Sequence, residues 1–329
     1  MVSMQDIADR VGVSKSAVSF VLNGKSDGRI SEETKNRILQ AARDLNYQIN
    51  EVARSLRTGQ SGIISVIVTD ISNEFFGKLV FYVQEEAKRH GYLVLTVNTN
   101  ENDAEFADAV GKIMGKHVDG IISVTPPGGA DTLLRIQEAR IPLVLFDRKF
   151  EDVDADYVGV DNFSSAKDAV GRLIAGGCRD IAFVGLGLDA GPLRERRRGY
   201  EAALEEAGLS GRAPMEFIRF EDKEEESEVR GAMREFLSPG SGVDAVFFSS
   251  RRVFTQAMNQ IPSLKGRLRK DVRLLCFDDV SSYLASDFSV SYVEQPIKEM
   301  AGKAFELLEE RIGGSDAGYE DYIFNTRCV

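Results

Sequence analysis

Cysteine and histidine are scarce in this sequence of 329 residues, which contains three of the first and two of the second. Cys178, Cys276 and Cys328 form no CxxC pair and show no metal-ligand spacing with His90 or His117. The thiols are therefore interpreted as inert side chains in a reducing compartment, which excludes a disulfide scaffold and a zinc site. Because neither histidine lies near an acidic or nucleophilic motif, hydrolase chemistry has little support, and we expect no catalytic activity, cofactor or metal.

Long apolar runs are absent as well. No run approaches the roughly 20 residues that cross a bilayer, and Asp6 and Asp9 lie where a secretion signal needs an apolar core. We therefore expect a soluble, cytoplasmic protein with no membrane partner. The sequence also lacks a Walker loop and a GxSxG nucleophile elbow. The glycines of 185–191 have GxGxxxG spacing, which does not match the dinucleotide-binding GxGxxG pattern.

Positive charge is in deficit, with 41 Lys and Arg against 52 Asp and Glu and a net charge of −11. Taken over the whole chain, this balance argues against a protein that coats nucleic acid through a basic surface. The charge is unevenly distributed, however. Residues 1–60 hold 9 basic and 7 acidic residues, whereas the remaining 269 residues hold 32 and 45. The first sixty residues therefore form a different kind of surface.

The first 47 residues have the pattern of short helices. Ser3, Ser14 and Ser31 are good N-caps, and Gly12 and Asn23-Gly24 are stop signals for the first two helices. Apolar residues recur at helical spacing on one face of each helix; they are Ile7, Ala8, Val11, Ala17, Val18, Val21, Leu22, Ile38, Leu39, Ala42 and Leu45. Two short helices around a tight glycine turn, backed by a third, are typical of a helix-turn-helix unit.

The second of these helices is the candidate recognition helix, because in this motif its N-terminal side chains reach base edges in the major groove. The polar residues expected to face outward are Ser14, Lys15, Ser16 and Ser19. The basic side chains that could hold phosphates are Arg29, Lys35 and Arg54, and an ordinary solvated charge is an equally good interpretation of each. Residues 1–48 are thus predicted to be a DNA-binding headpiece.

A polar segment, 49–61, follows and suits a linker. Val52, Ala53 and Leu56 lie at positions i, i+1 and i+4, so one short amphipathic helix could form within it. A helix of this length is marginal alone in water and would need a partner surface to persist.

From Gly62 onward, apolar strand-like runs alternate with helical stretches. The predicted strands are 63–69, 92–98, 118–124, 142–147, 156–161, 180–185, 244–249 and 272–277, and the predicted helices include 74–90, 163–176, 193–207 and 296–311. Near-continuous apolar strands separated by helices indicate parallel sheets covered on both faces, an α/β fold. The length favours two doubly wound lobes. Ligands of such sheets bind beyond the carboxyl ends of the strands, so we expect a site between the lobes.

Several long segments resemble the LacI/GalR family of bacterial transcription regulators. They are SMQDIADRVGVSKSAVSFVLNG (3–24), the run from RISEETKNRIL to DISNEFF (29–76), RERRRGYEAAL (194–204), CFDDV (276–280) and EQP (294–296). The resemblance implies a helix-turn-helix headpiece, a hinge helix, and a periplasmic-binding-protein-like core, 62–329, that binds a small effector and forms a homodimer. It places the N-terminal lobe at about 62–161 plus 294–318 and the C-terminal lobe at about 162–293 plus 319–329.

The resemblance also implies roles at the DNA. Lys15 and Ser16 match base-reading positions, and Phe20 stands where many members carry an arginine; it could touch a thymine methyl but cannot fork onto guanine. Leu56 matches a hinge leucine that wedges into the minor groove, with Arg54 and Arg57 beside it. The full set of expected DNA contacts is Ser3, Ser14, Lys15, Ser16, Ser19, Phe20, Asn23, Arg29, Asn50, Ala53, Arg54, Leu56 and Arg57.

In the core, the family places an arginine at Arg196, whose fixed donors fork onto an effector, and an acceptor of ligand hydroxyls at Asp278. Phe75 is expected to stack on a sugar face, although core packing is the commoner fate of a phenylalanine. Asp161-Asn162 also lies at a strand end facing the cleft. The full set of expected effector contacts is Asp70, Phe75, Phe76, Thr125, Asp147, Arg196, Ser250, Arg251 and Asp278.

One departure from the family concerns residues 249–252, Ser-Ser-Arg-Arg, where many members have Asn-Asp. A neutral or acidic ligand contact has become basic or has vanished. The sequence therefore suggests an acidic or phosphorylated sugar held by Arg251.

Together these features predict a dimeric repressor of carbohydrate-use genes that binds a pseudo-palindromic, double-stranded operator. Its effector would be a sugar, sugar acid or sugar phosphate that changes the relative pose of the lobes. The alternatives are a transport-type sugar receptor, a cytoplasmic enzyme on an α/β fold, and an activator or global regulator that needs a phosphoprotein partner.

Overall fold

The computed structural model describes residues 2–22, 30–47, 59–212, 214–218, 225–264 and 268–329. The chain divides into two compact units, Met1–Ser61 and Gly62–Val329. The division falls at the end of the segment predicted to be a linker. The predicted hinge helix, with Leu56, lies outside the described residues.

The first unit contains the expected helices α1 (Met4–Val11), α2 (Lys15–Leu22) and α3 (Glu32–Asp44). Ser3 and Asp6 form a capping box at the start of α1, and Gly12 ends that helix with a left-handed φ of 75°. The hydroxyls of Ser14 and Ser31 accept N–H bonds at the starts of α2 and α3. The serine caps and the glycine stop of the prediction are confirmed.

A small apolar core joins the three helices. It includes Ile7, Ala8, Val11, Val18, Val21, Ile38, Ala41 and Ala42. Arg37 on α3 donates from Nη2 to the carbonyl of Val11 at 2.7 Å, which ties α3 to the end of α1. The inward face of α2 is thereby fixed, and its other face is left for solvent or a partner.

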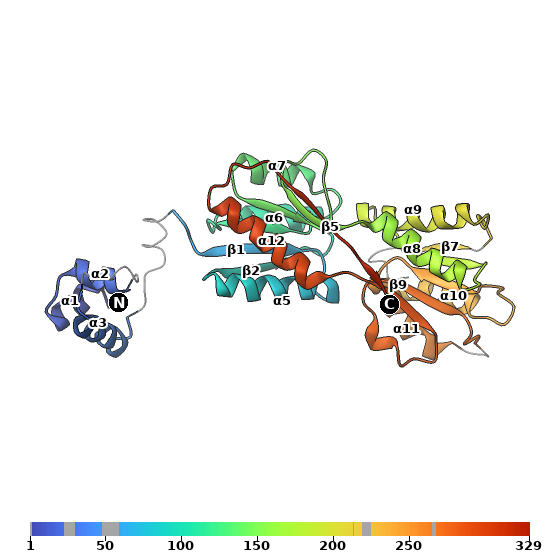
Figure 1. Cartoon of the computed structure of the whole chain (residues 1–329), viewed down its shortest axis with the longest axis horizontal. Coiled ribbons are helices and arrows are strands. Elements are labelled where there is room, and N and C mark those ends of the chain that lie inside the picture. The colour runs from blue at the N-terminus through green and yellow to red at the C-terminus, as the bar shows by residue number, and fades with distance from the viewer. Residues whose placement is uncertain (1, 23–29, 48–58, 213, 219–224, 265–267) are drawn as a thin grey trace. The chain divides into compact units, whose positions relative to one another are not determined.

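The second unit has two lobes, each built on a six-stranded sheet within the described residues (Figure 1). In the first lobe the strand order is β11-β5-β4-β3-β1-β2, and the paired strands run parallel. Its strands are β1 (Ile63–Val68), β2 (Leu93–Asn98), β3 (Gly120–Ser123), β4 (Leu143–Phe146), β5 (Asp156–Val160) and β11 (Asp321–Phe324). Helices α5 (Glu74–Arg89) and α12 (Ile297–Ile312) cover one face, and α6 (Asp103–Met114) and α7 (Ala130–Glu138) cover the other.

The second lobe repeats this plan with the order β12-β10-β9-β8-β6-β7. Its strands are β6 (Ile181–Leu186), β7 (Met215–Ile218), β8 (Ala245–Phe248), β9 (Arg273–Phe277), β10 (Val290–Glu294) and the antiparallel β12 (Arg327–Cys328). Helices α8 (Asn162–Ala175) and α9 (Gly191–Glu206) pack on one face, and α10 (Glu225–Phe236) and α11 (Arg251–Gln260) on the other. Short 3-10 turns lie at Ile261–Ser263 and Ser281–Tyr283.

The predicted strands are all present, and one lobe boundary needs correction. Residues 319–329 were expected in the second lobe, but β11 pairs with β5 in the first sheet, and only β12 joins the second. The reason is local. Helix α12 packs against β3, β4 and β5, so the chain that leaves it meets the edge of β5 first. There, Arg311 donates two hydrogen bonds, of 2.7 and 2.8 Å, to the carboxylate of Asp156.

The cysteines carry no disulfide: Cys178 and Cys276 are buried and Cys328 is half-buried. Burial raises the pKa of the Cys276 thiol well above its usual value. Within the described residues, no helix is long and apolar enough to cross a membrane, and no cluster of histidine, cysteine and carboxylate side chains has the arrangement of a metal site.

Candidate effector and DNA sites

The cleft between the lobes begins at two aspartates in equivalent places. Asp147 directly follows β4 and Asp278 directly follows β9, and each of these strands ends in a phenylalanine. Strand β4 is fourth from the β2 edge of the first sheet, and β9 is fourth from the β7 edge of the second. Both aspartates have left-handed backbone, with φ of 65° and 90°. An L-residue adopts this conformation at a cost, and such strain gathers at functional sites. The duplicated fold thus brings one buried carboxyl from each lobe to the same cleft.

These two carboxyls share an unusual environment. Burial raises the pKa of both Asp147 and Asp278, and the guanidinium of Arg196 opposes the rise in each case. Arg196 Nη1 lies 3.9 Å from Asp278 Oδ2. The charge of Asp278 also raises the pKa of Asp147. A bound hydrogen-bond donor would therefore stabilise the charged forms of these two buried carboxyls.

Arg196 projects from α9 and is itself buried, with its orientation fixed from three sides. Its Nε donates to Asn162 Oδ1 at 2.8 Å, its Nη1 donates to the carbonyl of Ser249 at 2.9 Å, and its guanidinium lies 3.8 Å from the centre of the Phe277 ring. These contacts leave Nη2 with no hydrogen-bond partner among the described residues. Asn162, at the expected strand end, therefore positions the arginine.

The neighbouring basic side chains of α9 are different. Arg197 and Arg198 are exposed and pair with Glu201 and Glu195 on their own helix at 2.7 and 2.8 Å. They are surface charges, as the sequence indicated for them. Within the RERRRG motif, the structure turns only Arg196 into the cleft among these three.

A second buried arginine, Arg148, was missed by the sequence analysis. It forms a two-pronged pair with Glu101, with both distances 2.6 Å, and donates to the carbonyl of Thr125 at 3.2 Å. Its Nε has no hydrogen-bond partner in the part of the chain that the structure describes, and neither has the buried Ser250 hydroxyl. A basic residue directly after a strand end was the only signal for Arg148. Its long-range partner could not be read from the sequence.

An apolar wall completes the site. Phe75 packs against Phe76 and Phe146 with ring centroids 5.3 and 6.1 Å apart. Leucine and proline side chains from the second lobe also line the cavity. The residues that line this cavity are Asp70, Asn73, Phe75, Phe76, Glu101, Asp147, Arg148, Leu186, Leu188, Ala190, Pro192, Leu193, Arg196, Ser250, Arg252 and Asp278. A few convergent polar groups against an apolar wall are typical of a small-molecule site.

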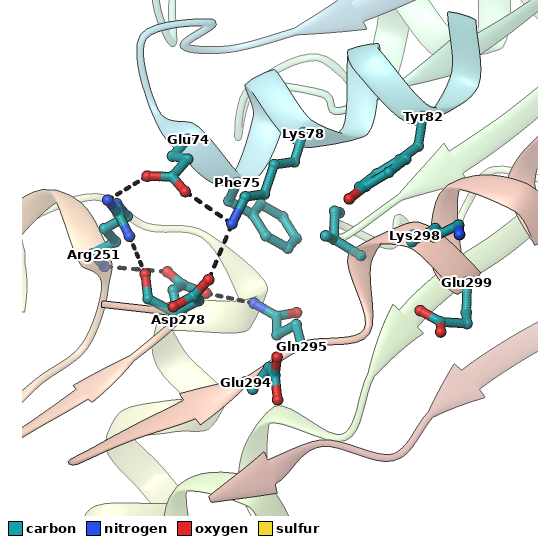
Figure 2. A pocket seen from close by; sticks show the side chains of 12 residues that line it. Glu74, Phe75, Lys78, Tyr82, Arg251, Asp278, Glu294, Gln295, Lys298 and Glu299 are labelled. Atoms are coloured by element: carbon teal, nitrogen blue, oxygen red, sulfur yellow. Dashed lines mark hydrogen bonds and ion pairs between the residues drawn. The ribbon is translucent and has the colours of Figure 1, made fainter. Parts of the chain in front are cut away.

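The expected effector residues line this cavity, with the exception of Thr125 and Arg251. Thr125 is fully buried beneath it; its hydroxyl bonds Ser123 at 2.7 Å and its carbonyl holds Arg148. Arg251 lines two adjoining pockets, and its guanidinium contacts Glu74 and the carbonyl of Asp279 (Figure 2). The expectation that Arg251 holds an acidic effector stays a prediction; in the structure its guanidinium contacts Glu74 and Asp279.

In the first unit, the outward face of α2 carries the expected polar residues. Ser14, Lys15 and Ser16 are exposed, Ser19 is half-buried, and Phe20 is 39% exposed. Ser3 is exposed at the start of α1, where it caps the helix, and Lys35 pairs with Glu32 at 3.3 Å. The remaining expected DNA contacts lie outside the described residues; they are Asn23, Arg29, Asn50, Ala53, Arg54, Leu56 and Arg57.

Comparison with known proteins agrees with this division. Residues 3–50 match the model of bacterial regulatory proteins of the lacI family, and residues 61–283 match that of periplasmic binding proteins and the sugar binding domain of the LacI family. The chain is 30% identical to the HTH-type transcriptional regulator PtxS of Pseudomonas aeruginosa, over 95% of this chain and 90% of that protein. It is 29% identical to the ribose operon repressor of Halalkalibacterium halodurans, over 100% and 96%.

A solved structure has the same fold. The lac repressor dimer bound to operator and the anti-inducer ONPF aligns with a TM-score of 0.83, covering 100% of this chain and 97% of its own chain. The sequence identity is 19%, so this likeness shows the fold alone.

Proposed function

From the premise that this chain belongs to the LacI family of bacterial regulatory proteins and is a DNA-binding transcription regulator, we propose that it represses carbohydrate-use genes. The names of its relatives support this proposal, since the chain is similar over its full length to a ribose operon repressor. It would act in the cytoplasm, where a bacterial operator lies. A transport receptor would have no use for the headpiece.

The DNA half of the proposal uses the outward face of α2. Lys15, Ser16 and Phe20 would enter the major groove, while Val18 and Val21 hold the helix to the headpiece core. Two headpieces, one from each copy of a homodimer, would bind the halves of a pseudo-palindromic operator. Leu56 and its neighbours would contact the minor groove between the half-sites.

The effector half is carried by one observation: Asp147 and Asp278, one from each lobe, converge with Arg196 on one cavity. Carboxylates accept hydrogen bonds from hydroxyls, and the open Nη2 of Arg196 donates to an oxygen. Phe75 offers an apolar face to a sugar ring. A polyhydroxylated effector satisfies all three kinds of group at once, and for this reason we propose a sugar or sugar acid as the ligand.

The same geometry explains control. An effector that bonds Asp147 and Asp278 together holds the two lobes in one relative pose. Strand β1 of the first lobe begins at Ile63, just after the linker, so a change in the lobes is transmitted toward the hinge. The coupling between effector and operator would be of the usual size, about 1–3 kcal/mol, or roughly 5–150-fold in affinity.

Dimerisation has a candidate surface on the first lobe. Phe81 on α5 is 55% exposed and Leu93 on the edge strand β2 is 66% exposed, with Leu95 next to it on the same side of the strand. An exposed apolar edge of this kind marks an interaction site. We propose that a second copy of this chain covers it.

A gel shift with the promoter region of the protein's own gene cluster tests the DNA half. A thermal-shift screen with neutral sugars, sugar acids and sugar phosphates tests the effector half, because a cleft ligand stabilises the folded core by mass action. Specific retardation of the promoter fragment and stabilisation by one class of sugar are expected. Retardation without any stabilising sugar would leave the DNA role standing and contradict the effector role.

A further inference from the structure

Beside the effector cavity, four charged residues from both lobes contact one another in a ring that includes one backbone carbonyl, with Glu74, Lys78 and Arg251 labelled in Figure 2. On the first lobe, Glu74 and Lys78 lie one turn apart on α5 and pair at 2.8 Å. Lys78 Nζ also reaches Asp279 of the second lobe at 3.0 Å. Arg251, at the start of α11, closes the ring by contacting the carboxylate of Glu74 and the carbonyl of Asp279.

The ring alternates in charge and is half-buried. Around it, Glu74, Lys78, Asp279 and Arg251 run negative, positive, negative, positive, and the side chain of Arg251 is 15% exposed. Partly buried pairs of this kind are less screened by salt than fully exposed surface pairs. Removing either cation leaves two carboxylates, Glu74 and Asp279, with one cation between them, and weakens the link between the lobes.

The titration behaviour agrees with this geometry. Burial alone would lower the pKa of Lys78, but the hydrogen bonds and charges of Glu74 and Asp279 raise it overall. Burial also opposes ionisation of Asp279, but hydrogen bonds from Ser281 and Lys78 lower its pKa overall. Both groups therefore stay charged around neutral pH.

The ring is joined directly to the effector site. The backbone N–H of Arg251 donates to Asp278 Oδ2 at 3.2 Å, and Gln295 Nε2 donates to Asp278 Oδ1 at 2.6 Å. Arg251 thus holds the carboxylate of Asp278, in the effector cavity, through its backbone N–H, and it contacts Glu74 of the opposite lobe through its side chain. A further pair between the lobes, Arg252 Nη1 to Asp70 Oδ2 at 3.2 Å, lies beside it.

We propose that Glu74, Lys78, Asp279 and Arg251 form an ionic latch that holds the two lobes closed and fixes Asp278 for the effector. The basic pair Arg251-Arg252 would then serve lobe closure, since both side chains contact acidic residues of the first lobe. The latch gives this chain a closed cleft that depends on ionic strength. Its link to the effector rests on the proposed function, whereas the latch itself does not.

The absence of tryptophan from the sequence makes a clean reporter possible. Tyr82 lines the pocket beside the ring and does not line the effector cavity. In the full-length protein, Tyr82→Trp provides a single emission that shifts to longer wavelength and becomes easier to quench with acrylamide when the pocket opens. We expect both changes in the Arg251→Met and Lys78→Met derivatives at low salt, and in the parent as sodium chloride is raised to 1 M.

Two further variants control this test. Arg251→Lys keeps the charge and should restore most of the closed signal. Lys167→Met breaks a comparable pair, Lys167 to Glu206 at 2.6 Å, whose members both belong to the second lobe, and should leave the emission unchanged. If Arg251→Met destabilises folding, Lys78→Met and the salt titration of the parent carry the test.

The latch is overturned if the ring variants keep the parent's emission, quenching and salt response, or if Lys167→Met changes them equally. Neither operator nor effector is needed for this measurement. Failure of the latch is therefore distinguishable from failure of the proposed regulatory function.

Discussion

At the scale of single residues, the site depends on a few buried charges whose partners are now defined. Arg196 compensates Asp147 and Asp278 and presents Nη2 to the cavity. Its removal should abolish ligand binding more completely than the loss of one neutral contact, because two buried carboxyls lose their counter-charge.

The first prediction concerns Arg196→Met. In the thermal-shift screen, the variant should lose the stabilisation that the best sugar gives the parent protein, while a gel shift should still show operator binding. Arg197→Met, an exposed neighbour on the same helix, is the matched control and should respond like the parent. A variant that still responds at the parent's sugar concentration would refute the site assignment.

The second prediction is a pH dependence. Asp278 has a pKa raised above its unfolded value of 3.8, so the folded state binds a proton that the unfolded chain has released. The stability from this group is fully present below about 3.8 and is lost as the pH rises through the folded value. The unfolding free energy of the parent, relative to that of Asp278→Asn, should therefore decrease as the pH rises over this range.

Urea unfolding of both proteins in a series from pH 4 upward measures this difference. A constant offset between the two curves would only report lost hydrogen bonds to Arg251 and Gln295. If the two curves stay parallel throughout, the raised pKa of Asp278 is contradicted.

Sequence reasoning found the strand-end acids because an acidic residue directly after an apolar strand lies at the ligand edge of a parallel sheet. It missed Glu101 because that residue acts through Arg148, 47 positions away, and no spacing announces such a pair. It also missed the protein contacts of Arg251, for a related reason. Its partners, Glu74 and Asp279, belong to different lobes, and no sequence spacing indicates their contacts with Arg251.

At the scale of secondary-structure elements, the strongly apolar strands were predictable, including the edge strand β2, whereas β7, β10, β11 and β12 were not. The predicted strands are near-continuous apolar runs, and all of them except β2 lie inside a sheet. By contrast, β7 has alternating exposure and β11 is mostly exposed, so neither produces a strong apolar signal. Edge strands take their place from the neighbour they pair with, which the local sequence does not contain.

The third prediction tests the edge formed by α5 and β2. Leu93→Asp places a charge on the exposed apolar strand and should shift the protein from dimer to monomer in sedimentation velocity, with weaker operator binding as a consequence. Leu134→Asp changes a 37% exposed leucine on α7, which covers the other face of the sheet, and should leave the dimer intact. A dimer that survives Leu93→Asp would place the interface elsewhere.

The fourth prediction concerns the hinge segment. Leu56→Ala removes the proposed minor-groove wedge and should weaken operator binding in a gel shift, while the sugar response of the core in the thermal-shift assay stays intact. Equal loss of both properties would contradict the wedge role, because it would indicate a general defect in folding.

At the scale of the whole molecule, the net charge of −11 takes on a different meaning. Its excess of acid belongs to residues 61–329, which carry the effector cleft, and the headpiece itself is only weakly basic. Non-specific attraction to DNA is then modest and falls steeply with salt. Specific binding would depend on dimerisation, the hinge and a few base contacts. A change in the relative pose of the core's lobes can therefore change the affinity for operator DNA.

The central claim is that a ligand held between Asp147, Asp278 and Arg196 changes the affinity of the headpieces for operator. Fluorescence anisotropy of a labelled promoter fragment, titrated with full-length protein with and without the stabilising sugar, tests it most directly. The account predicts a change in operator affinity of roughly 5–150-fold in the parent and none in Arg196→Met. An unchanged affinity in the parent, or an equal change in both proteins, would contradict it.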